Sequence, residues 1–245
     1  MWTDAIDSRN FYASDLGAVA RRMIQRRIRT IWPNVSGMEV LGLGFATPYL
    51  SPFHGEASHT LAAMPAAQGA LHWPTDGDGL TTLVDETDLP FADVSISRVL
   101  LVHALESTDN VRPMLREVWR VLASGGRMII VVPNRQGLWA RFESTPFGRG
   151  LPYSSRQIST VLRENLFTPY QSVKALFVPP TRSRMMLSSA LALEEIGLRW
   201  FPAFAGVTII EATKQIYAGH TQARHKSSII HLPQRGTRAP TRERI

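Results

Sequence analysis

The sequence contains no cysteine, which excludes disulfide bonds and metal sites built on thiolates. It also lacks any apolar run of about 18 residues, the length that a membrane-spanning helix requires. Residues 1–7 are acidic, whereas a signal peptide begins with basic residues and continues with apolar ones. From these absences we expect a cytoplasmic protein without a membrane span or a signal peptide.

Acidic residues are the minority among the charged ones, with 20 Asp and Glu against 27 Lys and Arg, and the net charge is +7. Many of the basic residues lie in residues 14–32 and 219–245, at the margins of the chain, so we do not expect nucleic acid as the partner. Residues 219–245 have little apolar periodicity, which predicts a basic, disordered tail. Its histidines lack the close spacing of metal ligands, and we assign no metal site.

The central stretch of the chain is residues 38–50, M-E-V-L-G-L-G-F-A-T-P-Y-L. An apolar run that breaks into glycines is typical of a buried parallel strand followed by a turn and a helix. Thr47 is the expected N-cap, and Pro48 the first helical residue. Nucleotide sites use this geometry, and a tight turn with no ligand is the alternative. An amphipathic helix that Ser14 can cap is predicted before it, over residues 14–32.

Apolar strands and amphipathic helices alternate through the remaining sequence. Further strands are expected at residues 59–64, 80–84, 94–105, 127–132, 172–178 and 207–213. Residues 66–79 are rich in glycine and proline and should form a loop. This alternation predicts one α/β domain over residues 1–218 with a mostly parallel sheet.

The remaining helices have recognisable ends. Thr108 or Asp109 is the expected cap of the helix after the fourth strand, which Gly125 and Gly126 should end. The run Y-S-S-R-Q at residues 153–157 predicts a capped helix start. A last helix is expected over residues 182–195, and Gly197 should close it.

Three segments then occur in a fixed order: D-E-T-D-L-P-F at residues 85–91, S-R-V-L-L-V-H-A-L-E at residues 97–106, and M-L-R-E-V-W-R-V-L-A-S-G-G-R-M-I-I-V-V-P at residues 114–133. Their order and spacing resemble the class I S-adenosylmethionine-dependent methyltransferases of the small-molecule, type 11-like group. The resemblance spans roughly residues 41–214. It implies a Rossmann-like sheet of seven strands, mostly parallel with an antiparallel last strand, and S-adenosyl-L-methionine as the cofactor.

The resemblance also assigns residues to the cofactor. Gly42 and Gly44 match the loop that passes close to the methionine part, where a Cβ would be in the way. Asp85 matches the acid that accepts a hydrogen bond from the adenine amine. Further cofactor contacts are expected from Ala46 in the loop and from Val102 at the end of the fourth strand. Gln68 is expected in place of the ribose carboxylate, and Glu86 lies beside Asp85.

The chain departs from the family pattern at two of these places. The loop usually begins with an acid, where this chain has Gly42, and continues with glycines, where it has Ala46 and Pro48. The Asp or Glu that should hold the ribose about twenty residues later is absent, and Gln68 is its neutral substitute. An amide binds hydroxyls more weakly than a carboxylate does, so we expect weakened cofactor binding.

Methyl transfer from a sulfonium depends mainly on alignment, and a base is needed only where the acceptor loses a proton. His103, at the end of the fourth strand, is the candidate catalytic base, with a hydrogen-bonded structural role as the alternative. Residues 134–180 correspond to a segment that covers the acceptor pocket in similar proteins. We expect a lid there, or plain packing on the sheet. Tyr153 and Arg156 within it are the expected acceptor contacts.

Two functional hypotheses follow. The first is a methyltransferase that acts on a small or medium acceptor. The second is a catalytically degenerate methyltransferase fold that serves as a protein partner or regulatory subunit. RNA methylation has only the net charge in its favour. The N-P-P-Y signature of amine methylation is absent, because residues 102–105 read V-H-A-L.

Overall fold

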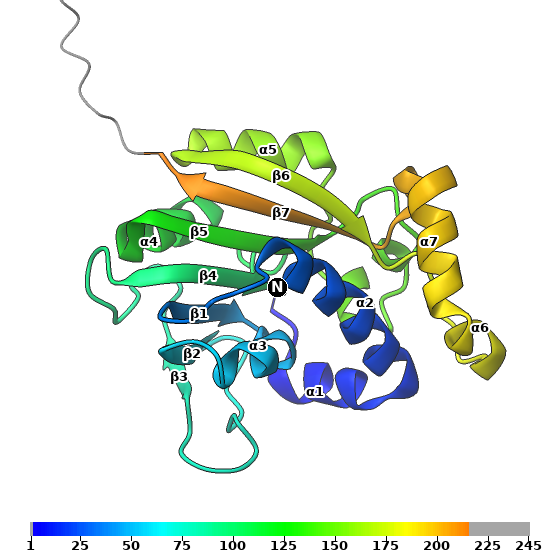
Figure 1. Cartoon of the computed structure of the whole chain (residues 1–245), viewed down its shortest axis with the longest axis horizontal. Helices are drawn as coiled ribbons and strands as arrows, with labels where there is room; N and C mark the ends of the chain where they lie inside the picture. Colours follow the sequence, from blue (N-terminus) through cyan, green and yellow to red (C-terminus); the bar gives the residue numbers. More distant parts are fainter. Residues whose placement is uncertain (1, 216–245) are drawn as a thin grey trace, which may run out of the picture.

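The computed structural model describes residues 2–215 and is centred on a seven-stranded sheet with the order β3-β2-β1-β4-β5-β7-β6 (Figure 1). The strands are β1 (Glu39–Gly44), β2 (His59–Pro65), β3 (Thr81–Val84), β4 (Ile96–Val102), β5 (Leu122–Pro133), β6 (Phe167–Ala175) and β7 (Val207–Lys214). Neighbouring strands from β1 to β5 are parallel, and β7 is antiparallel to both β5 and β6. The expected Rossmann-like sheet with an antiparallel last strand is confirmed. The predicted tail, residues 219–245, lies outside the described residues.

Helices cover both faces of this sheet, as Figure 1 shows. The helices are α1 (Ala5–Ala13), α2 (Asp15–Ile31), α3 (Thr47–His54), α4 (Val111–Val121), α5 (Ser155–Glu164), α6 (Arg184–Ser188) and α7 (Ala190–Trp200), with three 3-10 turns, η1 (Trp139–Arg141), η2 (Pro146–Gly148) and η3 (Pro202–Phe204). One apolar core joins the sheet to α1, α2 and α3, and a second joins its other face to α4 and α5. Because strands such as β4 are buried on both faces, they appear in the sequence as continuous apolar runs.

The predicted first helix corresponds to α2. The Ser14 hydroxyl accepts a hydrogen bond from the Gly17 N–H at 3.1 Å, as an N-cap should. One face of α2, which includes Met23, Ile24 and Ile28, is buried in the core. Helix α1, which precedes α2, was not predicted. Asp4 caps it by accepting a hydrogen bond from the Ile6 N–H.

Two helix ends differ from the expected ones. Ala46, not Thr47, occupies the N-cap of α3, and it provides no side-chain bond. Asn110, not Thr108 or Asp109, occupies the N-cap of α4. That helix ends at Val121, before Gly125 and Gly126, because Leu122 already pairs with Ile96 of β4 and starts β5.

Further corrections concern the last third of the chain. The strand expected at residues 172–178 lies at Phe167–Ala175 as β6, directly after α5. The helix expected over residues 182–195 is divided into α6 and α7, and Gly197 lies within α7 instead of ending it. A Cβ on Gly197 would lie only 2.3–2.6 Å from three carbons of the Phe177 side chain, so this glycine permits close packing.

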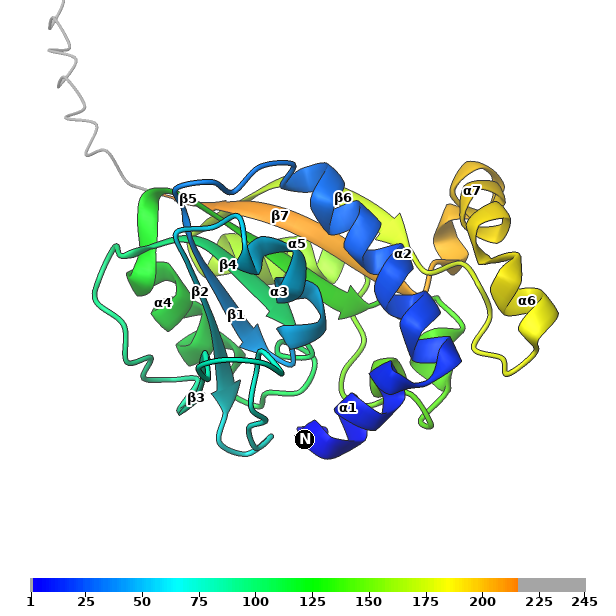
Figure 2. The ribbon, with the colours of Figure 1, turned by 60° about the horizontal axis from the view of Figure 1, so that its bottom comes forward.

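The sheet places its functional edge where β1 to β4 end. Gly44 pairs with Val102, and Pro65 pairs with Val84, so the carboxyl ends of these four strands lie together. Helix α1 lies beside this edge (Figure 2), and the Ala5 N–H donates a hydrogen bond to the Gln68 carbonyl at 2.9 Å. In open α/β sheets, ligands bind outside the carboxyl ends of the strands.

Candidate active site

Gly42 and Gly44, in the second half of β1, have local packing roles. A Cβ on Gly42 would lie 2.7 Å from the Ala46 Cβ and 2.7 Å from a Leu50 methyl, so the glycine lets α3 pack on β1. Gly44 has a φ of 84°, and its Cβ would collide with the Val102 carbonyl of the neighbouring strand. Ala46 and Val102 are fully buried. Packing of α3 on β1 therefore explains Gly42, and the tight turn explains Gly44, so a cofactor role needs separate support.

Gln68 gives that support. Its side chain is 1% exposed, and both its amide nitrogen and its amide oxygen are buried without a hydrogen-bond partner. An unpaired buried amide is costly, about 1–3 kcal/mol in protein mutational data. Gln68 follows β2 by three residues, where the ribose-binding position was expected. An amide can both donate to and accept from ribose hydroxyls, so this orphaned group fits the cofactor.

Asp85 and Glu86 follow β3 at the same edge. The Asp85 carboxylate accepts hydrogen bonds from the Thr87 hydroxyl at 2.7 Å and from the Thr87 N–H at 2.8 Å. These bonds, the hydroxyl first, lower the pKa of Asp85 below its ordinary value, so it is an ionised acceptor at neutral pH. Glu86 accepts a hydrogen bond from the Thr108 hydroxyl at 3.1 Å. The turn thus fixes one Asp85 oxygen and leaves the exposed carboxylate able to accept another donor.

His103 is the centre of a buried chain of hydrogen bonds. Its Nε2 lies 2.7 Å from the Tyr12 hydroxyl, and its Nδ1 lies 3.2 Å from Glu106 Oε1. The Tyr12 hydroxyl is also 3.0 Å from that of Tyr49. A Glu106 carboxylate can only accept, so His103 Nδ1–H donates to it, and Nε2 accepts from Tyr12. Burial raises the pKa of Tyr12 well above its ordinary value, so Tyr12 keeps its proton at neutral pH.

Two further features mark the surroundings of His103. Its φ of 51° lies in the left-handed region, which residues other than glycine seldom adopt and which costs of order 1–3 kcal/mol. The second oxygen of Glu106 is buried without a hydrogen-bond partner. Ser8, which faces inward from α1, carries another buried and unpaired oxygen. These two buried oxygens therefore lack hydrogen-bond partners within the described residues, and a ligand at this edge would supply them.

Helix α1 separates two hollows. On one side, a hollow of about 540 Å³ is bounded by α1, α2, the start of α3 and the loop after β2. Its lining includes two arginines and three aromatic rings: Arg9, Arg21, Tyr12, Phe45 and Trp73. Tyr12 stacks on Phe45 with ring centres 5.8 Å apart. Neither arginine has an ion pair among residues 2–215.

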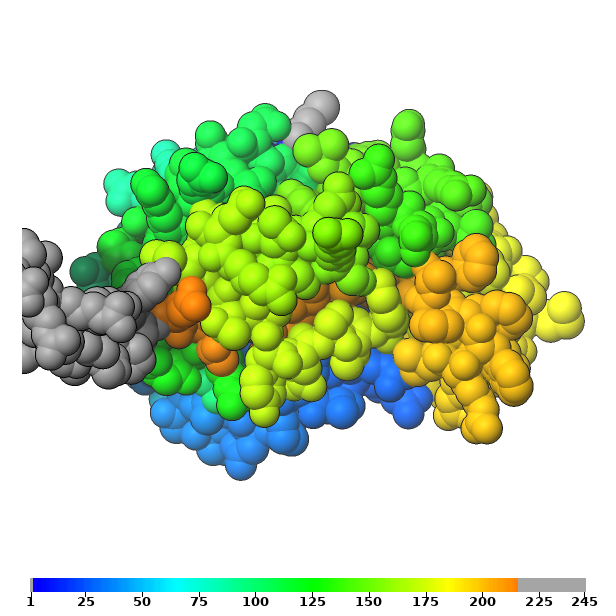
Figure 3. All heavy atoms as spheres, turned by 90° about the horizontal axis from the view of Figure 1, so that it is seen from above, coloured from blue at the N-terminus to red at the C-terminus, as the bar shows by residue number. Residues whose placement is uncertain are grey.

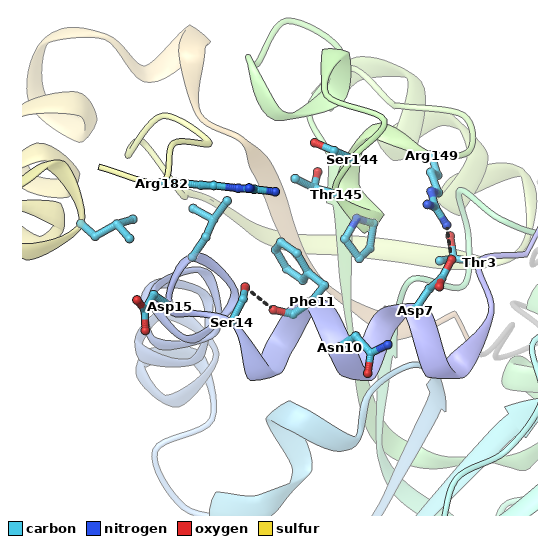
Figure 4. A pocket seen from close by; sticks show the side chains of 13 residues that line it. Thr3, Asp7, Asn10, Phe11, Ser14, Asp15, Ser144, Thr145, Arg149 and Arg182 are labelled. Carbon is cyan, nitrogen blue, oxygen red and sulfur yellow. Dashed lines mark hydrogen bonds and ion pairs between the residues drawn. The ribbon is translucent and has the colours of Figure 1, made fainter. Parts of the chain in front are cut away.

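The second hollow, of about 500 Å³, lies between α1 and residues 144–149 (Figure 4). Figure 4 shows Phe11 in its middle, with Arg182 on one side and Arg149 on the other. Arg149 forms an ion pair with Asp7 at 2.9 Å. Phe11 contacts the Phe147 ring at 6.1 Å, and Phe147 in turn lies 4.8 Å from the His103 ring. His103 is therefore in contact with Tyr12, which lines the first hollow, and with Phe147, which packs on Phe11 of the second hollow.

Residues 150–153 of the expected lid segment lie directly on the turn after β4. The Leu151 N–H donates to the Glu106 carbonyl at 2.8 Å, and a Cβ on Gly150 would collide with that carbonyl. Burial, and then the charge of Glu106, raise the pKa of Tyr153. Arg156 is exposed in the first turn of α5 and forms no ion pair in the described part of the chain. The structure thus brings Tyr153, but not Arg156, to the edge.

Within residues 2–215, no group of three or more His, Asp or Glu side chains could hold a metal ion. None of the helices described is both long enough and apolar enough to cross a membrane.

Known proteins resemble this chain in sequence and in fold. The Methyltransferase domain family matches residues 42–130. A demethylmenaquinone methyltransferase from Thermus thermophilus is 26% identical over 159 residues, 64% of this chain. The chain spans 65% of the length of that relative.

Solved structures share the fold at low sequence identity. The methyltransferase from Haloferax volcanii in complex with the Trm112 activator has a TM-score of 0.60 at 16% identity, over 88% of this chain and 100% of that one. A geranyl diphosphate C-methyltransferase from Streptomyces coelicolor, in complex with S-adenosyl-L-homocysteine, has a TM-score of 0.54 at 14% identity, over 78% of this chain and 77% of that one. Residues 42–130 thus match a methyltransferase domain, and the chain shares the fold of these methyltransferase structures.

The sequence pointed to His103 and Gln68 as candidates but not to the residues that contact His103. Glu106 is three residues from His103, and that spacing was a usable signal. Tyr12 and Tyr49 lie 91 and 54 positions earlier and are brought to His103 only by the fold. The spacing of Ala5, Ser8 and Tyr12, the buried residues of α1, is helical, and it follows a capping aspartate. Because Ala5 is small and Ser8 is polar, these positions do not form a visible apolar stripe in the sequence.

Proposed function

We propose that the protein transfers a methyl group from S-adenosylmethionine to a small or medium acceptor. The observation that carries this proposal is the Gln68 amide, which is buried at the carboxyl edge of the sheet with both polar atoms unpaired. Ribose hydroxyls would satisfy both atoms. When bound, S-adenosylmethionine supplies an electrophilic methyl group on a positively charged sulfur.

The residues around the first hollow suit the other parts of this cofactor. Arg9 and Arg21 offer cationic groups to a carboxylate. Tyr12 and Trp73 offer aromatic faces, which attract a ligand cation. Asp85 offers an ionised acceptor to an exocyclic amine. Ala46 and Val102 act through their backbones, since their side chains are buried.

The buried chain at His103 supplies a route for a proton. An acceptor hydroxyl or amine can pass its proton to the Tyr12 oxygen while the Tyr12 proton moves to His103 Nε2. The imidazolium that forms is stabilised by the Glu106 carboxylate on Nδ1. In this proposal, His103 acts as the base through Tyr12, because its own ring is 1% exposed. Because Tyr12 lines the first hollow, the acceptor is proposed to reach the Tyr12 hydroxyl there, beside the cofactor. Tyr153 is the proposed acceptor contact from residues 134–180.

Calorimetric titration of S-adenosylmethionine into the protein tests the cofactor step. We expect a Kd below about 1 mM, which corresponds to more than about 4.1 kcal/mol of binding free energy. Transfer of a labelled methyl group to acceptors from a cell extract then tests the reaction. Binding without transfer would leave the acceptor unknown, whereas a Kd above that value would contradict the proposal.

A second candidate, a partner or regulatory subunit without catalysis, is favoured by the glycine turn. The Cβ positions of Gly42 and Gly44 are already crowded by protein atoms, and the loop after β2 carries no carboxylate from Ala66 to Gln68. The relative from Haloferax volcanii is itself bound to an activator protein. Absence of cofactor binding, with the fold intact, would select this candidate.

A further inference from the structure

Large apolar side chains are exposed together at the end of the molecule where α6, α7 and η3 lie. Six of the fourteen exposed large apolar residues described fall within residues 185–204. Four of them form what we call the apolar ridge: Ile196, Trp200, Phe201 and Phe204, which are 52%, 68%, 55% and 58% exposed. Ile196 and Trp200 are four residues apart and share one face of α7. Phe201 and Phe204 continue from the end of that helix into η3.

The apolar ridge projects from the body of the protein. Figures 1 and 2 show α6 and α7 standing beyond the ends of β6 and β7, and Figure 3 shows the same segment as a protruding end next to α2. The three aromatic side chains of the ridge, Trp200, Phe201 and Phe204, are each more than half exposed on this projecting segment. Aromatic side chains on a projecting segment are typical of the boundary between water and lipid.

Arginines lie on both sides of the apolar ridge. Arg26, Arg27 and Arg199 line a hollow of about 560 Å³ between α2 and α7, which Ile196 and Trp200 also line. Arg135 and Arg141 line another hollow together with Phe204. None of these five arginines has an ion pair among the residues described.

The acidic residues near the ridge do not cancel this charge. Glu194 is 4% exposed, and its carboxylate accepts hydrogen bonds from the Leu176 N–H at 3.0 Å and the Phe177 N–H at 2.8 Å. Glu195 is exposed in the same hollow, against three arginines. The apolar ridge is therefore bordered by a positive excess, which complements anionic headgroups.

We propose that the apolar ridge docks on the surface of an anionic phospholipid membrane. The aromatic rings enter the headgroup boundary, and the flanking arginines bind lipid phosphates. A second copy of the chain is a poorer occupant, because a two-fold contact through the ridge would bring two sets of unpaired arginines together. Docking of this kind needs no spanning helix and is independent of the proposed reaction.

Flotation with lipid vesicles tests this docking on the full chain. We expect binding to vesicles of mixed phosphatidylcholine and phosphatidylglycerol, and weaker binding to pure phosphatidylcholine or at high salt. The double variant Trp200→Ser, Phe204→Ser should bind at least about tenfold more weakly. Leu83→Ser, which changes an equally exposed residue on β3, is the matched control and should bind as the parent does. All three proteins keep the basic residues 216–245, so attraction through those residues is common to them.

Circular dichroism of each variant shows whether its fold is intact. A second variant, Arg199→Gln, leaves the aromatic rings in place and should reduce both the binding and its salt dependence. Equal vesicle binding by the parent and the double variant would overturn the proposal, as would no binding by the parent. A dimer in sedimentation velocity that Trp200→Ser dissolves would also overturn it, because a second copy would then cover the ridge.

Discussion

Replacing Gln68 by methionine should move stability and cofactor affinity in opposite directions. Methionine has nearly the length of glutamine but no hydrogen-bonding amide. In the protein without cofactor, Gln68 buries two unpaired polar atoms, at a cost of about 1–3 kcal/mol. Gln68→Met should recover much of this, which would raise the melting temperature by about 2–4 °C per kcal/mol for a chain of this size.

Cofactor binding should respond in the other direction. If the amide holds ribose hydroxyls, its loss removes at least one hydrogen bond, and we expect the Kd for S-adenosylmethionine to rise about tenfold, or about 1.4 kcal/mol. Thermal unfolding with and without cofactor, together with calorimetry, measures both quantities on the same samples.

Thr60→Val is the matched control for this experiment. Thr60 also buries an unpaired oxygen and lies on β2, but at the start of the strand, where it pairs with Val40 far from the carboxyl edge. This variant should gain stability and leave the Kd unchanged. If Gln68→Met instead lowered the stability of the free protein and did not affect the Kd, the amide would have an internal structural partner, and the reasoning from its burial would be refuted.

Three further predictions concern single side chains. Tyr12→Phe keeps the ring that stacks on Phe45 but removes the hydroxyl, so methyl transfer should fall by about a hundredfold or more while the Kd for cofactor stays constant; a change confined to the Kd would contradict the relay. Asp85→Asn should weaken cofactor binding about tenfold in calorimetry. Because Thr87 lowers the pKa of Asp85, parental affinity should be constant above about pH 5 and fall only in more acidic solution, and a loss near neutral pH would exclude this residue. Burial raises the pKa of Glu194 above 4.5, so the folded state binds this proton more tightly than the unfolded state does. The unfolding free energy from denaturant titration should therefore decrease as the pH rises from about 4.5 through the higher folded pKa, and Glu194→Gln should lack this component; equal pH dependence in the two proteins would count against it.

The sheet could be predicted because its strands are buried on both faces. Residues 99–102 are all fully buried in β4, and such a run is visible as continuous apolar sequence. Helix ends were less predictable, because tertiary pairing decides them. The pairing of Leu122 with Ile96 ends α4 before Gly125, although the glycine is the stronger local signal.

Candidate site residues could be predicted only where a side chain that can bind or react directly follows a predicted strand. His103 follows the end of β4, and Asp85 follows the end of β3, so topology alone brings both to one edge. Tyr12 could not be found in this way, because it belongs to a helix whose inward residues are small or polar. Its place depends on the hydrogen bonds that its hydroxyl makes with His103 and Tyr49, and these partners are distant in sequence.

Helix α1 contacts both halves of the candidate site, and a double-mutant cycle can show whether it does so as a rigid unit. The Ala5 N–H binds the Gln68 carbonyl, and the Tyr12 hydroxyl, two turns further along, binds His103. The side chains of Gln68 and Tyr12 share no hydrogen bond in the described structure, so the effects of Gln68→Met and Tyr12→Phe on kcat/KM should add within about 0.3–0.5 kcal/mol. A larger coupling would mean that changes at Gln68 shift α1 and displace Tyr12 from His103. In that case cofactor binding and proton transfer would depend on one movement of the same helix.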